Sequence, residues 1–140
     1  SDAALLVTAD HGALDVPTER RIDIADDPRL AAGLRVVAGE PRARYLHTVD
    51  GAEQDVLAAW REVLGARADV LSRDEAIARD MFGPVRPEHL ARIGDVVVVC
   101  AGDTIVLATG HEPDTVGRLV AYHGSTTAVE TAVPLISFRP

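Results

Sequence analysis

The residue types best suited to metal chemistry lie in two short stretches near opposite ends of the sequence. Asp10 and His11 stand side by side before Gly12, and His123 stands before Gly124. Zinc takes carboxylate oxygen and imidazole nitrogen at about 2.0–2.2 Å, and a neighbouring glycine permits a tight turn and the close approach of a ligand. Because an Asp-His-Gly tripeptide is also common in exposed loops, the tripeptide alone leaves both a metal site and an ordinary loop open.

An apolar run precedes the first of these stretches. Residues 3–8 read Ala-Ala-Leu-Leu-Val-Thr, which is typical of a strand buried on both faces of an α/β sheet. Residues 9–17 are polar and turn-rich, so Asp10 and His11 are expected in a loop at the carboxyl end of that strand, where open α/β sheets place their sites. A strand buried on both faces needs neighbours on both sides, so we expect the chain to be part of a larger protein.

The middle of the chain, about residues 35–109, has the pattern of a small α+β unit. Strands are expected at residues 35–38, 42–49, 68–71, 96–100 and 104–108, and helices at 50–65, 72–80 and 87–93. Short turns join the first two strands and the last two strands, which predicts two hairpins. The first helix has Trp60 on its apolar face, so Trp60 is expected in the core. The order predicts a sheet with helices on one face.

The last stretch is expected to return to the first. Residues 118–121 are strand-like, a short helix follows Thr127, and residues 135–138 form a final apolar strand. Glu follows three residues after Asp50, Ser72 and Thr127, which predicts three capped helix starts. The hydroxyl groups of residues 125–127 are therefore interpreted as helix caps rather than nucleophiles. We predict a core made of residues 1–17 and 118–140, with residues 18–117 inserted as a cap.

Composition limits the partners. Of the 140 residues 47% are hydrophobic and 26% charged, values of a globular chain rather than a disordered one. The net charge of −8 argues against binding a nucleic-acid polymer. No apolar stretch reaches the roughly 20 residues of a membrane span, so no membrane partner is expected. Cys100 is the one cysteine in the sequence and is expected to be a small buried hydrophobe.

Two motifs together resemble a known family. Residues 5–17, Leu-Leu-Val-Thr-Ala-Asp-His-Gly-Ala-Leu-Asp-Val-Pro, resemble the metal-binding strand and loop of the alkaline phosphatase superfamily. Their Asp-Val-Pro tail is similar to the type I phosphodiesterase and nucleotide pyrophosphatase branch. The stretch His123-Gly124-Ser125, followed by Glu130 and Val-Pro-Leu at 133–135, resembles the segment that closes the family's core.

The resemblance implies a fold and a chemistry. The fold would be α/β: the C-terminal part of an alkaline-phosphatase-like core with an inserted α+β cap. Two divalent metal ions, expected to be zinc, would serve in-line displacement at phosphorus. Asp10 and His11 would bind one ion and His123 the other. The substrate would be a small phosphodiester or a nucleotide.

The chain departs from the family pattern in one respect. The family's Thr or Ser nucleophile and its remaining ligands lie upstream of Asp-His-Gly, and only nine residues precede Asp10. The chain by itself is therefore predicted to be inactive. Self-association through an uncovered edge of the sheet is an expected consequence of its apolar first strand.

Two alternatives stay open. In one, residues 35–109 form a non-catalytic binding module and Asp10 and His11 are only a loop; in the other, the chain belongs to a sulfatase or phosphomutase of the same superfamily. The hydrolase hypothesis requires Asp10, His11 and His123 to converge. His47 and His89 are interpreted as surface or structural residues, His111 leaves a casual metal site open, and the charged residues 19–21 are interpreted as solvated.

Overall fold

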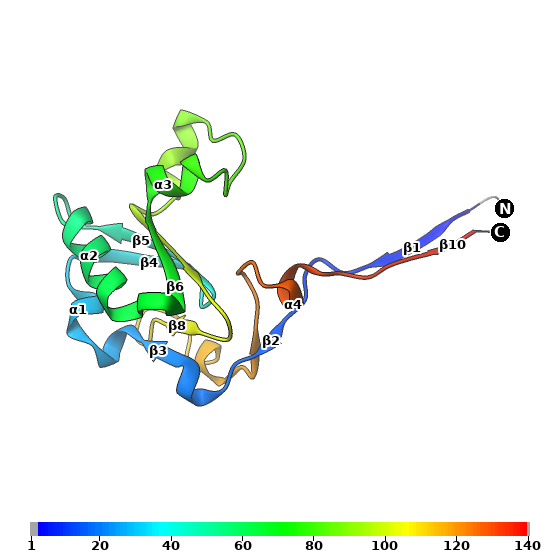
Figure 1. The fold of residues 1–140 in the computed structure, drawn as a ribbon, viewed down its shortest axis with the longest axis horizontal. Helices are drawn as coiled ribbons and strands as arrows, with labels where there is room; N and C mark the ends of the chain where they lie inside the picture. Colours follow the sequence, from blue (N-terminus) through cyan, green and yellow to red (C-terminus); the bar gives the residue numbers. More distant parts are fainter. Residues whose placement is uncertain (1–2, 140) are drawn as a thin grey trace.

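The computed structural model describes residues 3–139 and is built around a four-stranded antiparallel sheet in the order β4-β5-β7-β6 (Figure 1). The strands of this sheet are β4 (Leu34–Glu40), β5 (Ala43–Thr48), β6 (Ala68–Ser72) and β7 (Val96–Cys100). Of the two central strands, β5 has alternately buried and half-buried side chains, and β7 is buried along nearly its whole length. The mixed α/β class predicted from the sequence is confirmed.

One face of the sheet carries the main core. Helix α2 (Glu53–Leu64) packs on β6 and β7, and α1 (Pro28–Ala31) packs against α2. Trp60 is fully buried there, as predicted, and its indole N–H donates to the carbonyl of Leu30 at 3.1 Å. Val96, Val98 and Cys100 of β7 point into the same cluster. Alternate residues of β7 therefore face α2, as the period of two of a strand requires.

The opposite face carries a second, smaller core, so the prediction of helices on one face is wrong. Val97 and Leu71 point there and pack with Ala76 and Ile93. Ala76 lies in α3 (Arg73–Ala78), and Ile93 directly follows the 3-10 helix η4 (Pro87–Arg92). The apolar side chains of β6 and β7 cover both faces, so each face needs its own cover.

The second predicted hairpin is also wrong. Strand β8 (Ile105–Leu107) pairs in parallel with β3 (Arg21–Asp23) and not with β7. Both lateral edges of β7 are already occupied, by β5 and by β6. Strand β3 is flanked by the 3-10 helices η1 (Thr18–Arg20) and η2 (Ile24–Asp26).

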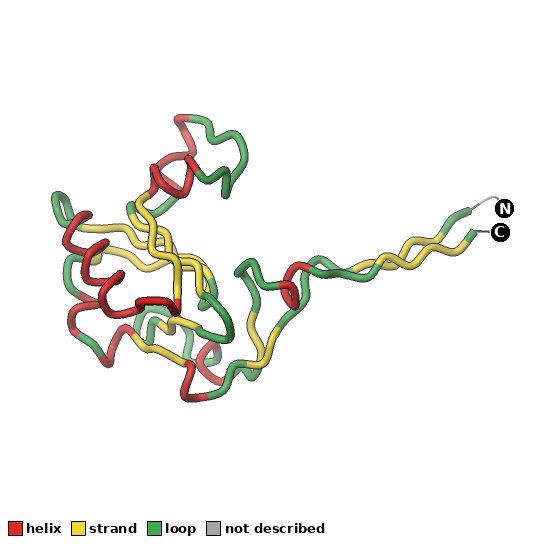
Figure 2. Tube along the Cα trace, in the orientation of Figure 1, coloured by secondary structure: helices red, strands yellow, loops and turns green. Residues whose placement is uncertain are grey.

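The two ends of the chain pair with each other, as expected (Figure 2). Strand β1 (Leu5–Thr8) pairs with β10 (Leu135–Phe138), and β2 (Leu14–Asp15) pairs with β9 (Ala121–Tyr122), both antiparallel. The β1–β10 ribbon projects away from the four-stranded sheet (Figure 1). The prediction that residues 3–8 are buried on both faces is wrong: among residues 3–139, β10 is the one strand beside β1, and Leu6 is 64% exposed.

Short helices complete the chain: η3 (Gly65–Arg67), η5 (Val116–Arg118) and α4 (Ala128–Thr131). Of the three predicted capping boxes, the one at Ser72 is confirmed. Helix α2 begins after Ala52 without a side-chain cap, and the Thr127 hydroxyl donates to the Glu130 carboxylate instead of capping α4. None of the helices between residues 3 and 139 has the length and apolar character needed to cross a bilayer.

Candidate functional site

The rings of His11 and His123 lie face to face. Their centroids are 3.5 Å apart and their planes differ by 19°. The two residues are 112 positions apart in the sequence. Strands β2 and β9 pair just beyond them, and the backbone N–H of Gly12 donates to the carbonyl of Glu130 at 2.8 Å. The structure therefore brings together the two motifs that the sequence singled out.

Gly12 allows this approach because it has no side chain. A Cβ at this position would lie 1.9 Å from the carbonyl oxygen of Val129, far inside van der Waals contact. The sequence had suggested that Gly12 makes room for a ligand. The room is taken instead by the backbone of α4, so Gly12 joins the first motif to the second.

Glu130 holds the loop that carries His123. Its buried carboxylate accepts hydrogen bonds from Arg42 Nε at 2.9 Å, from Arg42 Nη2 at 2.6 Å and from the backbone N–H of Ser125 at 3.0 Å. Burial opposes ionisation of this carboxyl, but the bonds from Arg42, Thr127 and Ser125 outweigh it and lower the pKa of Glu130 to about 2. Glu130 is therefore a permanent anion at neutral pH, and it ties residues 125–130 to the turn between β4 and β5.

The hydroxyl and thiol groups nearest the second motif are engaged. Ser125 Oγ is buried and donates to the carbonyl of Cys100 at 2.6 Å, which is neither a capping bond nor the geometry of an activated nucleophile. Burial raises the pKa of the Cys100 thiol to about 11. Cys100 is thus the buried hydrophobe predicted from the sequence, and it is protonated at neutral pH.

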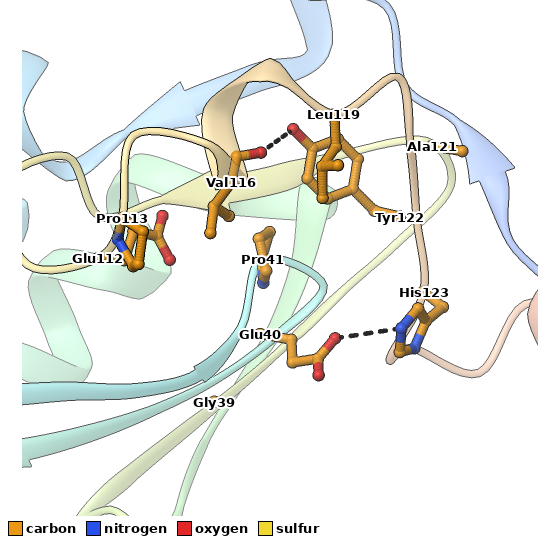
Figure 3. A pocket seen from close by; sticks show the side chains of 10 residues that line it. All are labelled: Gly39, Glu40, Pro41, Glu112, Pro113, Val116, Leu119, Ala121, Tyr122 and His123. Carbon is orange, nitrogen blue, oxygen red and sulfur yellow. Dashed lines mark hydrogen bonds and ion pairs between the residues drawn. The ribbon is translucent and has the colours of Figure 1, made fainter.

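Each of the two stacked histidines has a carboxylate beside it. Asp10 Oδ2 lies 3.7 Å from His11 Nε2, and Glu40 Oε2 lies 3.5 Å from His123 Nε2 (Figure 3). The other ring nitrogen of His11, Nδ1, lies 2.7 Å from the carbonyl of Gly12. A carbonyl only accepts, so Nδ1 carries the hydrogen, and Nε2 of the neutral ring presents its lone pair towards Asp10. Hydrogen bonds from the backbone N–H groups of Asp10 and His11 lower the pKa of Asp10 and keep it ionised.

Asp10, His11 and His123 are thus brought together, whereas Glu40, Arg42 and Glu130 were missed as site residues. Within the described range, no three His, Cys, Asp or Glu side chains surround one point where they could jointly hold an ion. The site consists of two pairs, each with an acidic and an imidazole group.

A pocket of about 380 Å³ opens beside His123 (Figure 3). Most of its lining is apolar or uncharged: Gly39, Pro41, Pro113, Val116, Leu119, Ala121 and Tyr122. The Tyr122 hydroxyl donates to the carbonyl of Val116 at 2.7 Å, so it is occupied. The carboxylate of Glu112 also reaches the pocket but is bound by Arg44 at 2.7 Å. An organic group of modest size fits such a surface.

Two other expectations can be compared with the structure. The open alternative of a metal site at His111 finds no support among residues 3–139, because the neighbouring Glu112 accepts from Arg44 and from the backbone N–H of Ala108. The interpretation of Arg21 as a solvated charge is wrong. Its guanidinium donates to the carbonyls of residues 16, 117 and 119 at 2.9–3.2 Å, and so fastens the start of β3 to the segment before β9.

Comparison with known proteins places these motifs in context. The family model "type I phosphodiesterase / nucleotide pyrophosphatase" matches residues 1–126. Murine ectonucleotide pyrophosphatase/phosphodiesterase 5 is similar with a TM-score of 0.74 and 18% identity, over 98% of this chain and 34% of that one. The human protein of the same name gives 0.73 and 17%, over 96% and 33%.

A bacterial enzyme shares the fold as well. Phosphonoacetate hydrolase from Sinorhizobium meliloti 1021, in complex with phosphonoformate, gives a TM-score of 0.64 and 25% identity, over 96% of this chain and 36% of that one. The chain therefore spans about a third of the length of the solved structures that it matches.

Proposed function

Because the chain belongs to the type I phosphodiesterase / nucleotide pyrophosphatase family of the alkaline phosphatase superfamily, we propose that it forms part of a two-metal active site that hydrolyses phosphodiester or pyrophosphate bonds. The substrate of the whole protein is a small phosphodiester or a nucleotide. The observation that carries this proposal is the stacking of His11 on His123, with Asp10 beside the first ring. A binding module centred on the four-stranded sheet has no need for this convergence.

The donor set fits a divalent cation. Ligands about 2.0–2.1 Å from a tetrahedral ion lie roughly 3.4 Å apart, and the Asp10 and His11 atoms are 3.7 Å apart. The pKa of Asp10 is lowered, and in the neutral His11 ring a hydrogen bond from Nδ1 to the Gly12 carbonyl leaves Nε2 to face a metal ion. Asp10 and His11 would hold one ion and His123 the other. Bound there, the ions would activate the attacking oxygen and neutralise charge on the phosphoryl group.

The other residues of the site orient these ligands. The Gly12 carbonyl fixes the tautomer and the direction of the His11 ring. The carboxylate of Glu130 holds Ser125, two residues after His123, and so limits the movement of the His123 loop. The attacking hydroxyl is proposed to come from sequence that precedes this chain, since Ser125 and Thr127 both use their hydroxyls in hydrogen bonds.

The test is hydrolysis of bis(p-nitrophenyl) phosphate by the full-length protein that contains this sequence, with zinc present. His11→Ala and His123→Ala should each lower kcat/KM by about 100-fold or more, because each removes a metal ligand. His89→Ala, on η4, is the matched control and should leave activity unchanged. The 140-residue chain alone should show no turnover.

Two results would contradict the proposal. Full activity of the His123→Ala protein would remove His123 from the site. A strong preference of the unsubstituted protein for p-nitrophenyl sulfate over the phosphodiester would assign it to sulfatase chemistry within the same superfamily.

A further inference from the structure

We propose that Glu40, the last residue of β4, is a ligand of the same cation as His123; this assignment rests on the proposed function above. Glu40 belongs to the four-stranded sheet and is distant in sequence from both motifs. It would make the sheet a contributor to the metal site rather than only a cover over it.

The spacing of the donor atoms fits a shared cation. Glu40 Oε2 and His123 Nε2 are 3.5 Å apart, and their side chains point toward one another from β4 and from the loop after β9 (Figure 3). That separation is close to the roughly 3.4 Å between two ligands of a tetrahedral zinc ion. It also resembles the 3.7 Å between Asp10 and His11. The site thus holds two similar carboxylate–imidazole pairs, which matches the number of ions that the proposed chemistry uses.

The chain around Glu40 is tied to the loop that carries His123. The turn after it carries Arg42, whose fully buried guanidinium is bound by Glu130, the residue that also holds the His123 loop. The two segments touch at Gly124, where an added Cβ would lie 3.5 Å from the Cβ of Arg42 and 3.7 Å from that of Glu40. Glu40 and His123 therefore face one another across a packed contact, which is the kind of support that a metal site needs.

The negative charges of the site also favour bound cations. Asp10 and Glu40 bring two negative charges, and in the described part of the chain the basic groups beside them are the imidazoles of His11 and His123 respectively, not an arginine. Divalent cations between the members of each pair would balance these charges.

The experiment is a zinc titration of the full-length protein that contains this sequence, followed by the NMR signals of the imidazole rings, for the unsubstituted protein, Glu40→Gln and Glu88→Gln. Glu40 is 57% exposed, so its replacement should not disturb folding, which circular dichroism verifies. In Glu40→Gln, the zinc affinity measured from the His123 signals should fall by about 10-fold or more. Loss of a residue that only hydrogen-bonds to a ligand already costs about 10- to 100-fold. The affinity read at His11 should change less. Glu88→Gln, an exposed control on η4, should bind as the unsubstituted chain does.

The outcomes separate the two proposals. If the His123 signals of Glu40→Gln respond to zinc at the same concentrations as those of the unsubstituted chain, Glu40 is not a ligand, and the proposed function stands without it. If zinc moves neither His11 nor His123 in the unsubstituted chain, the metal site itself is wrong. A fall in affinity confined to Glu40→Gln supports both.

Discussion

Arg42 and Glu130 form an ion pair in which both side chains are buried, and the pair joins residues 88 positions apart in the sequence. The guanidinium donates to both carboxylate oxygens, at 2.9 and 2.6 Å, and its remaining terminal nitrogen donates to the carbonyl of Thr104. A buried pair is compatible with stability only when its remaining polar atoms are bonded, as they are here. This pair fixes the distance between the β4–β5 turn and the His123 loop.

Glu130→Gln should therefore destabilise the protein strongly. The substitution leaves the Arg42 charge buried without a counter-charge, which costs about 3–5 kcal/mol in the free energy of unfolding. Urea denaturation measures it. Glu62→Gln is the matched control, because Glu62 pairs with Arg29 at an exposed site and such pairs contribute at most about 1 kcal/mol. An equal effect of the two substitutions would show that the Arg42–Glu130 pair is not a main support of the fold.

The same carboxylate predicts a dependence of stability on pH. The pKa of Glu130 is about 2 in the folded protein against 4.5 for an unperturbed glutamate, so the unfolded chain binds a proton at higher pH than the folded one does. The stability that Glu130 contributes is fully present above about pH 4.5 and is lost as the pH falls towards 2. Urea midpoints between pH 7 and pH 2 measure this loss. The difference between the unsubstituted protein and Glu130→Gln should shrink over that window; a constant difference would contradict the low pKa.

Gly12→Ala should separate the two histidines. The added methyl group would lie 1.9 Å from the carbonyl oxygen of Val129, so the first motif must move away from α4. Nuclear Overhauser contacts between the His11 and His123 rings should weaken or vanish, while circular dichroism keeps the signal of the distant sheet. Gly117→Ala is the control, because its Cβ would make only an ordinary 3.8 Å contact with Leu107. Unchanged ring contacts in Gly12→Ala would mean that glycine is not needed at this junction.

The β1–β10 ribbon predicts self-association. Directly paired residues of an antiparallel ladder share a face, so Leu5, Val7, Ile136 and Phe138 form one wholly apolar face, and all four are exposed. Ile136→Lys should shift sedimentation velocity profiles towards the monomer, because it places a charge in that face. Thr8→Lys, which lies on the other face of the ribbon, should have less effect. A chain that sediments as a monomer at all concentrations would contradict the prediction.

The convergence of the two motifs was expected from the family resemblance. In the structure, the pairing of β1 with β10 and of β2 with β9 brings Asp10, His11 and His123 together. The helix around Trp60 and the Ser72 cap were predictable because their signals are local.

The features that were missed depend on partners far along the chain. Nothing in the pattern around Arg42 indicates a buried guanidinium, because its burial depends on Glu130. Glu40 lies in the turn between the predicted strands 35–38 and 42–49, and no pattern there indicates a metal ligand. Strand β8 followed a turn typical of a hairpin, but β5 and β6 occupy both edges of β7, and β3 became its partner. Tertiary competition of this kind overrides local preference.

The separation of His11 and His123 along the chain also bears on folding kinetics. Strands β4 to β7 lie within residues 34–100 and can pair by closing shorter loops. The two imidazole rings meet only when the long loop between residues 11 and 123 has closed. Distant contacts of this kind form late, because the entropy of loop closure must be lost before they stabilise anything. During synthesis Asp10 and His11 are translated before His123, so the first motif has no partner until the second has been made. Occupancy of the histidine pair would therefore report that folding is complete.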